Sequence, residues 1–339
     1  MISLPEINDI LSNYPAYRSK QVYDAIFKSL YDNWDQATNL PNNLKAELIE
    51  KAPLSIKNET FVSKDQKTVK ALIYLEDGKC VETVLMKLHD RNSLCISTQV
   101  GCPIGCVFCD SGRAGFIRNL TISEIITQVI FFARYLKKTS EMITNIVFMG
   151  MGEPLLNYDN VISSIRLLAD KETLGLSFRR FSISTSGILP GIKKLAEEKD
   201  FPINLAISLH SAVNEKRSQL MPINKTYRLD ELSESIQDYF AKTKRKLMFE
   251  YILLDKINVS KEDALALRDF LSKIKVAYTV NLIPINLTDC GYSAPSASDI
   301  NIFKKYLDHY KIDYIQRYSF GKDIKAACGQ LAKRTNTQE

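Results

Sequence analysis

The chain lacks any long run of apolar residues. No segment of its 339 residues approaches the roughly 20 consecutive apolar side chains that a membrane-spanning helix needs. Its first residues, Met-Ile-Ser-Leu-Pro-Glu, also lack the basic and then apolar pattern of a secretion signal. Without a secretion signal, the seven cysteines are not expected to form disulfides, so we expect a protein of the reducing cytoplasm. Without a long apolar segment, we expect no membrane partner.

Histidine is scarce, and the chain has neither the second C-x2-C pair nor the H-x3-H pair that would complete a closed zinc site. What the chain does have is three clustered cysteines, Cys102, Cys106 and Cys109, in Val-Gly-Cys-Pro-Ile-Gly-Cys-Val-Phe-Cys. A closed zinc site or an electron-transfer cluster normally has four ligands. Three thiolates on a four-iron cluster leave one iron open. The spacing therefore predicts a [4Fe-4S] cluster whose open iron binds and cleaves a substrate.

The remaining composition is that of a globular protein of moderate positive charge. Hydrophobic residues make up 45% of the chain, which is long enough for one barrel-sized domain and a smaller appendage. Lysine and arginine number 45 against 39 acidic residues, giving a formal net charge of +6. This balance permits an anionic polymer as a partner without proving one.

The order of predicted elements indicates an α/β fold. Residues 1–58 read as short helices, and residues 59–92 as a β-hairpin that turns at Asp77-Gly78. From residue 93 to 290, strands alternate with helices six times. The predicted strands cover 94–97, 145–149, 181–184, 203–208, 247–253 and 278–283. Six such units predict a parallel sheet curled into a partial (β/α)6 barrel, followed by a carboxyl-terminal extension over 291–339.

Small and polar residues follow several of these strands, where the chemistry of such sheets gathers. The segments are Gly150-Met151-Gly152-Glu153, Ser184-Thr185-Ser186, Ser208-Leu209-His210 and Pro284-Ile285-Asn286. Each alone is also an ordinary turn or loop. Their recurrence at one edge of the sheet predicts a binding site for a ligand that carries hydroxyl and ammonium groups.

Several motifs in order resemble one known family over nearly the whole chain. They are the cysteine loop, Phe116-Ile117-Arg118-Asn119-Leu120, the segment Gly150 to Asn157, Ser208-Leu209-His210, Met221-Pro222-Ile223-Asn224, and Asp323 to Leu331. They are similar to the radical-SAM RNA adenine methyltransferases of the RlmN/Cfr family. The resemblance implies a TIM-like radical-SAM barrel.

The resemblance also implies a mechanism with two further cysteines. Cys328 matches the position that takes a methyl group from one S-adenosylmethionine. A second S-adenosylmethionine, bound to the open iron, is cleaved to a 5′-deoxyadenosyl radical that abstracts hydrogen from this methyl group, and the resulting radical adds to an adenine carbon. Cys95 matches the residue that releases the product by forming a disulfide with Cys328, and Glu82 matches the proton acceptor.

The same match extends to ligands and partners. It implies two S-adenosylmethionine molecules per turnover, 23S ribosomal RNA with tRNA as a second substrate, and an external one-electron reductant such as flavodoxin; we expect a monomer. The matching cofactor-binding positions are Gly152, Glu153, Ser184, Ser208, Leu209, His210 and Asn286. His210 has a structural histidine as its alternative. Basic residues that could meet RNA phosphates are Lys64, Lys67, Lys70, Arg113, Arg118 and the run 242–246.

The site of methylation follows from finer motifs. Glu153-Pro154-Leu155-Leu156-Asn157 and Ile283-Pro284-Ile285-Asn286 are similar to the RlmN branch, which methylates C2 of adenine. Three other segments lean toward the Cfr branch, which methylates C8: Leu209-His210-Ser211, Arg217 to Met221, and Ser319-Phe320-Gly321. We expect C2, at the adenine 2503-type site of 23S ribosomal RNA and at adenine 37 of tRNA. The alternatives are a C8 enzyme, a radical-SAM enzyme of another RNA, and an RNA-binding protein with a structural metal.

Overall fold

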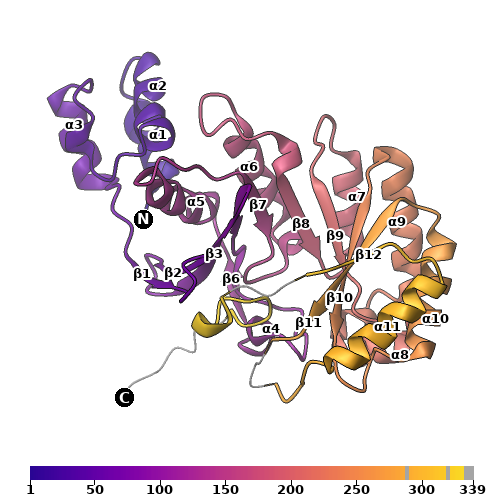
Figure 1. Ribbon diagram of the computed structural model, residues 1–339. Coiled ribbons are helices and arrows are strands. Elements are labelled where there is room, and N and C mark those ends of the chain that lie inside the picture. Colours follow the sequence, from indigo (N-terminus) through magenta and orange to yellow (C-terminus); the bar gives the residue numbers. More distant parts are fainter. Residues whose placement is uncertain (287–289, 318–320, 332–339) are drawn as a thin grey trace.

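One continuous sheet organises the molecule. The computed structural model describes residues 1–286, 290–317 and 321–331 (Figure 1). Ten strands form the main sheet in the order β1-β2-β3-β4-β7-β8-β9-β10-β11-β12. Because β1 and β12 are both edge strands within the described residues, the sheet stays open. A partial barrel is thus confirmed.

Seven parallel strands form the barrel part of this sheet. They are β4 (Arg91–Cys95), β7 (Asn145–Phe148), β8 (Phe181–Thr185), β9 (Asn204–Ser208), β10 (Leu247–Leu253), β11 (Tyr278–Pro284) and β12 (Tyr314–Gln316). The first six correspond to the predicted β/α units. The seventh, β12, comes from the carboxyl-terminal extension and was not predicted.

The hairpin continues the same sheet with antiparallel strands. β1 (Asn58–Val62), β2 (Thr68–Tyr74) and β3 (Cys80–Leu88) pair in sequence, and β3 pairs with β4. The predicted turn at Asp77-Gly78 is confirmed, since Gly78 has a φ of +77° and Leu75 N donates to Lys79 O at 2.8 Å. The hairpin is therefore joined rigidly to the edge of the barrel.

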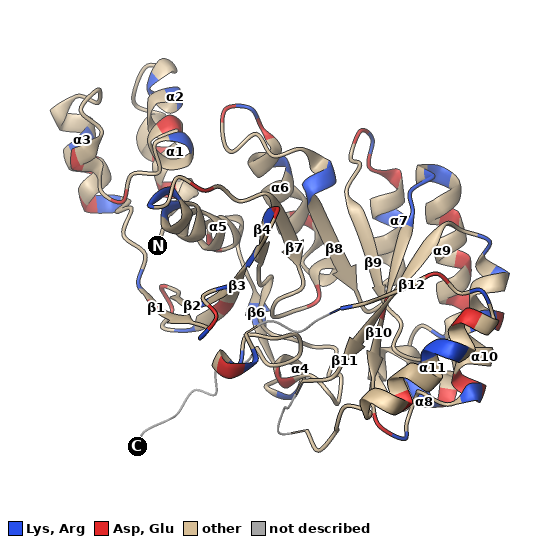
Figure 2. Cartoon of the chain, in the orientation of Figure 1, with Lys and Arg blue, Asp and Glu red and all other residues tan. Residues whose placement is uncertain are grey.

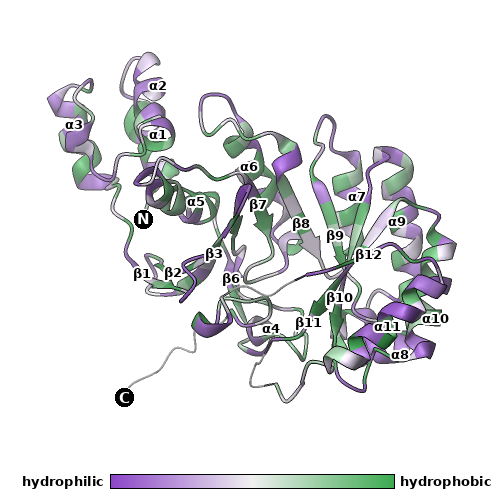
Figure 3. Cartoon of the chain, in the orientation of Figure 1, coloured by the Kyte–Doolittle hydropathy of each residue, from purple (hydrophilic) through white to green (hydrophobic). Residues whose placement is uncertain are grey.

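Helices cover the outer face of the sheet. They are α5 (Ile122–Lys137), α6 (Tyr158–Ala169), α7 (Leu189–Glu197), α8 (Asn214–Leu220), α9 (Leu229–Thr243), α10 (Lys261–Ile274) and α11 (Ala297–His309). Charged residues lie mainly on their outward sides (Figure 2), and apolar residues follow the strands (Figure 3). A capping box begins α5, because Thr121 Oγ1 accepts from Glu124 N and the Glu124 carboxylate accepts from Thr121 N.

The amino-terminal helices pack against α5. They are α1 (Leu4–Leu11), α2 (Tyr17–Tyr23) and α3 (Asn42–Lys51), and a π-helical turn, Asp24–Lys28, follows α2. Leu4 N donates to Ser123 Oγ at 3.0 Å, and Arg134 on α5 donates to the carbonyls of Leu54 and Tyr31. No helix within the described residues is long and apolar enough to cross a membrane.

Candidate active site

A small two-stranded sheet holds the cysteine loop in place. β5 (Gln99–Gly101) pairs with β6 (Phe116–Asn119), and the short helix α4 (Asp110–Arg113) lies between them. Cys102 N donates to Gly115 O at 2.9 Å, which closes the base of the loop. Gly101 has a φ of +78°, and a Cβ there would lie 1.8 Å from Gly115 O. Only glycine permits this closure.

The three cysteines of the loop influence one another. Burial, followed by Cys109 and Cys102, raises the pKa of the Cys106 thiol, and the Arg217 guanidinium opposes this rise. Burial also raises the pKa of Cys109, and hydrogen bonds from Gly112 and Ser111 lower it again. Such donors stabilise a thiolate. The loop thus supplies the hydrogen bonds to sulfur that cluster ligands typically receive.

The residues fit an iron–sulfur cluster better than a single ion. No three His, Cys, Asp or Glu side chains in the described part of the chain are arranged to hold one metal ion. In a cubane each cysteine binds a different iron, so the three sulfurs need to surround the cluster rather than converge on one point. The three thiols influence one another and so lie near each other, which makes them the candidates for cluster ligands.

The turn after β7 approaches the cysteine loop. Gly152 has a φ of +103°, and a Cβ there would lie 2.6 Å from Gln99 Cβ. The buried Glu153 carboxylate accepts hydrogen bonds from Ser186 N at 2.7 Å and Ser186 Oγ at 2.8 Å. Burial raises the pKa of Glu153, and these hydrogen bonds lower it. Glu153 also lies within electrostatic range of Cys102 and Cys106, so Gly152 and Glu153 both border the expected cluster.

The next two strands present hydroxyl groups side by side. Ser184 Oγ on β8 lies 3.4 Å from Ser208 Oγ on β9. Glu250 pairs with Ser208 across β9 and β10, and its Oε1 accepts from Asn281 Nδ2 at 2.9 Å. The Oε2 atom of Glu250 is buried without a hydrogen-bond partner in the described structure. Sequence patterns missed Glu250, because a single acid inside an apolar strand carries no motif.

His210 has a structural role in this arrangement. Its Nδ1 accepts from Ile252 N at 3.1 Å, and its ring meets Phe108 of the cysteine loop edge-on at 5.0 Å between centroids. Burial, and then Arg217, lowers the pKa of His210 to about 3. The neutral imidazole therefore ties β10 to the cysteine loop. Leu209 is fully buried beside it, and its carbonyl accepts from Arg217.

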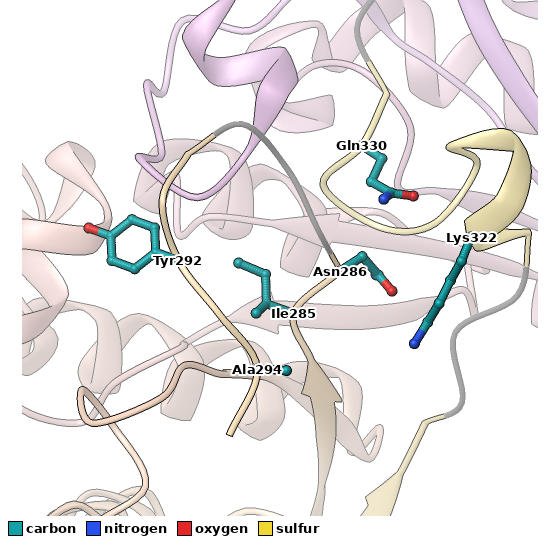
Figure 4. Close-up of a pocket in the computed structure, with 6 residues that line it drawn as sticks. All are labelled: Ile285, Asn286, Tyr292, Ala294, Lys322 and Gln330. Carbon is teal, nitrogen blue, oxygen red and sulfur yellow. The ribbon is translucent and has the colours of Figure 1, made fainter. Parts of the chain in front are cut away.

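Asn286 connects the end of β11 with the carboxyl-terminal segment. Its Nδ2 donates to Cys328 O at 3.2 Å, and its Oδ1 is buried with no hydrogen-bond partner among the described residues. Asn286 lines a cavity of about 230 Å³ between these two segments (Figure 4). The other lining residues are Ile285, Tyr292, Ala294, Lys322 and Gln330. An unsatisfied amide oxygen at a cavity wall fits a ligand that donates a hydrogen bond.

Cys95 and Cys328 lie within electrostatic range of each other. Cys95 is buried at the end of β4, and burial followed by Cys328 raises the pKa of its thiol. Cys328 is exposed as a residue, yet desolvation of its thiol raises the pKa; Arg317 lowers this pKa, and Glu250 and Cys109 raise it. Both thiols are free in this structure. The fold thus gathers two cysteines from distant parts of the sequence next to the cysteine loop.

The predictions for basic residues need correction at two positions. Lys70 is 8% exposed and faces Glu82, so it is not available to a phosphate. Arg118 donates to Asp77, to both carboxylate oxygens of Glu124 and to Asn119 O. These hydrogen bonds hold β6 against the hairpin and α5. Lys64 and Lys67 are exposed, and Arg113 is partly exposed near Asp110. Ser319 and Phe320 lie outside the described residues.

Comparisons with known proteins identify the family of the chain. The model of the radical SAM superfamily matches residues 96–268. The chain is 44% identical over 329 residues to a probable dual-specificity RNA methyltransferase RlmN of Dictyoglomus turgidum, covering 96% of this chain and 94% of that protein. For the corresponding protein of Pseudothermotoga lettingae the identity is 43%, and the coverages are 94% and 92%. The crystal structure of a radical SAM methyltransferase from Sphaerobacter thermophilus superposes with a TM-score of 0.92 at 39% identity, covering 97% of each chain. The chain therefore belongs to the radical SAM superfamily and, within it, to the RlmN family of RNA methyltransferases.

Proposed function

We propose that this enzyme methylates C2 of an adenine in 23S ribosomal RNA, at the 2503-type site, and of adenine 37 in tRNA. The observation that carries the proposal is the approach of Cys328 to Cys95 beside the three cluster cysteines. An ordinary methyltransferase that moves a methyl cation needs neither of these extra thiols. Adenine C2 is not nucleophilic, so its methylation requires radical chemistry and a protein group that carries the carbon.

The cofactors of this family are a [4Fe-4S] cluster and S-adenosylmethionine. Cys102, Cys106 and Cys109 would hold the cluster, and together the bound cofactors would supply a radical and a methyl group. S-adenosylmethionine would be held by Gly152, Glu153, Ser184, Ser208 and Asn286. Their positions support this assignment, because backbone, carboxylate, hydroxyl and amide groups meet at one edge of the sheet. Leu209 and His210 are buried, and this position favours a structural role for them in the wall of the site.

The chain's own residues would complete the reaction. The Cys328 sulfur carries the methyl carbon to adenine, and the Glu82 carboxylate accepts the proton that leaves C2. The Cys95 thiolate then attacks the Cys328 sulfur. A sulfur–sulfur bond forms while the carbon–sulfur bond breaks, and the electron pair left on carbon takes a proton to give the methyl group. The exposed position of Cys328 and the buried position of Cys95 suit a carrier that meets RNA and a resolving thiol behind it.

The test uses enzyme reconstituted anaerobically with iron and sulfide, and supplied with S-adenosylmethionine and with dithionite as the electron donor. Wild-type protein should convert a 23S ribosomal RNA fragment and a tRNA transcript to 2-methyladenosine, measured by mass spectrometry against an 8-methyladenosine standard. Cys328→Ala should form neither product, whereas Cys95→Ala should remain bound covalently to RNA, because it lacks the resolving thiol. Cys80→Ala is the matched control. Formation of 8-methyladenosine, or activity of Cys328→Ala, would contradict the proposal.

The surroundings of the enzyme complete the proposal. A one-electron donor such as flavodoxin would reduce the cluster, since the chain's described residues hold no second group of clustered cysteines that could store electrons. We place the enzyme in the cytoplasm, where its RNA substrates are made, and expect it to act as a monomer.

A further inference from the structure

Lys70 occupies an unusual position for a lysine. It lies on β2 within the hairpin and is 8% exposed. Its Nζ lies 3.5 Å from Glu82 Oε1 on the neighbouring strand β3 and 3.2 Å from Lys325 O. The ammonium also lies 5.5 Å from the centre of the Phe61 ring. A buried ammonium is costly unless each of its contacts stabilises the charge, and these three contacts do so.

The contact with Lys325 connects Lys70 to the segment that bears Cys328. We call residues 321–331 the carrier loop. Asp323 Oδ2 accepts from Lys64 N at 2.8 Å, and Gly329 O accepts from Asp110 N at 2.9 Å. A Cβ on Gly321 would lie 2.7 Å from Thr68 Cγ2. The carrier loop is thus held between the hairpin on one side and the cysteine loop on the other.

Lys70 joins the two groups whose relative position matters for the last half of the reaction. One ammonium contacts both the Glu82 carboxylate and the backbone three residues before Cys328. Glu82 is itself only 4% exposed, so the Lys70 ammonium 3.5 Å from its Oε1 compensates a buried carboxylate and fixes the direction in which it points. The same contact fixes where the carrier loop passes Glu82.

We propose that Lys70 is a positioning residue that holds the Glu82 carboxylate in place against the carrier loop. This inference rests on the proposed function, in which Cys328 carries the methyl carbon and Glu82 accepts the proton. When that proton leaves, the adenine C–H bond breaks, an O–H bond forms on Glu82, and the electron pair stays in the ring. The iron–sulfur cluster that Cys102, Cys106 and Cys109 would hold would accept the one surplus electron.

Loss of a lysine that only supported the fold would have a different effect from loss of a positioning lysine. The first loss would reduce the amount of folded enzyme, so every step would fall in the same proportion. Loss of a positioning lysine would leave the early steps running and slow the proton transfer. The covalent RNA adduct would then accumulate, and 5′-deoxyadenosine would form without a matching amount of methyladenosine.

The experiment compares Lys70→Met and Lys70→Arg with Lys193→Met, a control on the exposed side of α7. Each reconstituted holoenzyme is assayed for methylated Cys328, RNA-bound protein, 5′-deoxyadenosine and methyladenosine. Lys70→Met should still methylate Cys328 but raise the ratio of 5′-deoxyadenosine to methyladenosine about tenfold or more, a loss typical of a displaced catalytic group. Lys70→Arg keeps the charge and should return most of the wild-type ratio, and the control should not change it.

The outcomes separate the two proposals. If wild-type enzyme forms no methyladenosine, the proposed function fails. If wild-type enzyme is active and Lys70→Met has the same ratio of 5′-deoxyadenosine to methyladenosine, the role proposed for Lys70 is wrong. If Lys70→Met does not fold or does not bind the cluster, Lys70→Gln is measured instead, because glutamine still donates a hydrogen bond but removes the charge. The same ratio then decides.

Discussion

His210 shows how the fold can fix in place a side chain that a motif predicts to bind a ligand. Within Ser208-Leu209-His210 it follows a strand that ends at the site. Its Nδ1, however, accepts from Ile252 N, and its carbonyl accepts from Asn258 Nδ2 at 2.8 Å. Its backbone φ of +58° is left-handed, which few residues adopt without support. These contacts make the ring a neutral link between β10 and the cysteine loop.

The depressed pKa of His210 predicts a loss of stability in acid. The unfolded chain takes up a proton on His210 near pH 6.5, while burial lowers its pKa in the folded protein to about 3. The folded state therefore loses stability as the pH falls below 6.5, by about 1.4 kcal/mol per pH unit. In His210→Asn the amide oxygen can still accept from Ile252 N but does not titrate.

We expect the advantage of wild-type protein over His210→Asn to shrink by about 2 kcal/mol between pH 6.5 and pH 5. The measurement is equilibrium urea unfolding of the cluster-free protein under reducing conditions. An unchanged difference between the two proteins over this range would mean that the folded imidazole takes up a proton as readily as the unfolded one.

At the scale of elements, the shape of the cysteine loop depends on a backbone closure at its base. Gly101, at the end of β5, lies against Gly115, the residue before β6, and both residues have positive φ. They differ in their surroundings. A Cβ on Gly101 would collide with Gly115 O at 1.8 Å, whereas a Cβ on Gly115 would meet nothing within 4 Å. The pair therefore separates backbone strain from collision.

We expect Gly101→Ala to bind much less iron and sulfide than wild-type protein, because the collision opens the base of the loop. Gly115→Ala has the same kind of strain, about 1 kcal/mol, without the collision, and should keep most of its cluster. Iron and sulfide analysis with the visible absorption spectrum after reconstitution provides the measurement. Equal loss in both variants would show that strain alone, rather than contact with Gly115 O, controls the loop.

Much of the element order could be predicted from sequence, and the failures have physical causes. The six parallel strands, the Asp77-Gly78 turn and the Thr121 cap are set by local patterns. β12 has three residues of mixed exposure, so no periodicity marks it, and it forms because β11 offers a free edge. Burial of Lys70 depends on the carrier loop, 255 residues away in sequence. No local pattern records such a contact.

At the scale of the molecule, the position of the basic residues matters more than their number. Residues 242–246 precede β10, so they lie where the parallel strands begin, whereas the cysteine loop lies where these strands end. There Lys242 pairs with Glu197 at 3.5 Å and Lys246 with Asp313 at 3.1 Å. Lys64 and Lys67 are exposed on the turn between β1 and β2, and Lys64 N contacts Asp323 of the carrier loop. Of these two groups of lysines, the pair on the β1–β2 turn is the one joined to the segment that bears Cys328.

RNA that reaches Cys328 should therefore contact the turn between β1 and β2 and make no contact with residues 242–246. Each lysine that neutralises a phosphate releases counterions, so its removal weakens binding and lowers its dependence on salt. We expect Lys64→Gln with Lys67→Gln to reduce the slope of log Kd against log salt by about 1.5. Lys242→Gln with Lys244→Gln removes the same charge from the far edge and should leave the slope unchanged. Filter binding of a 23S ribosomal RNA fragment over a salt series distinguishes them. Equal slopes for both double variants would mean that net charge, rather than the hairpin, attracts the RNA.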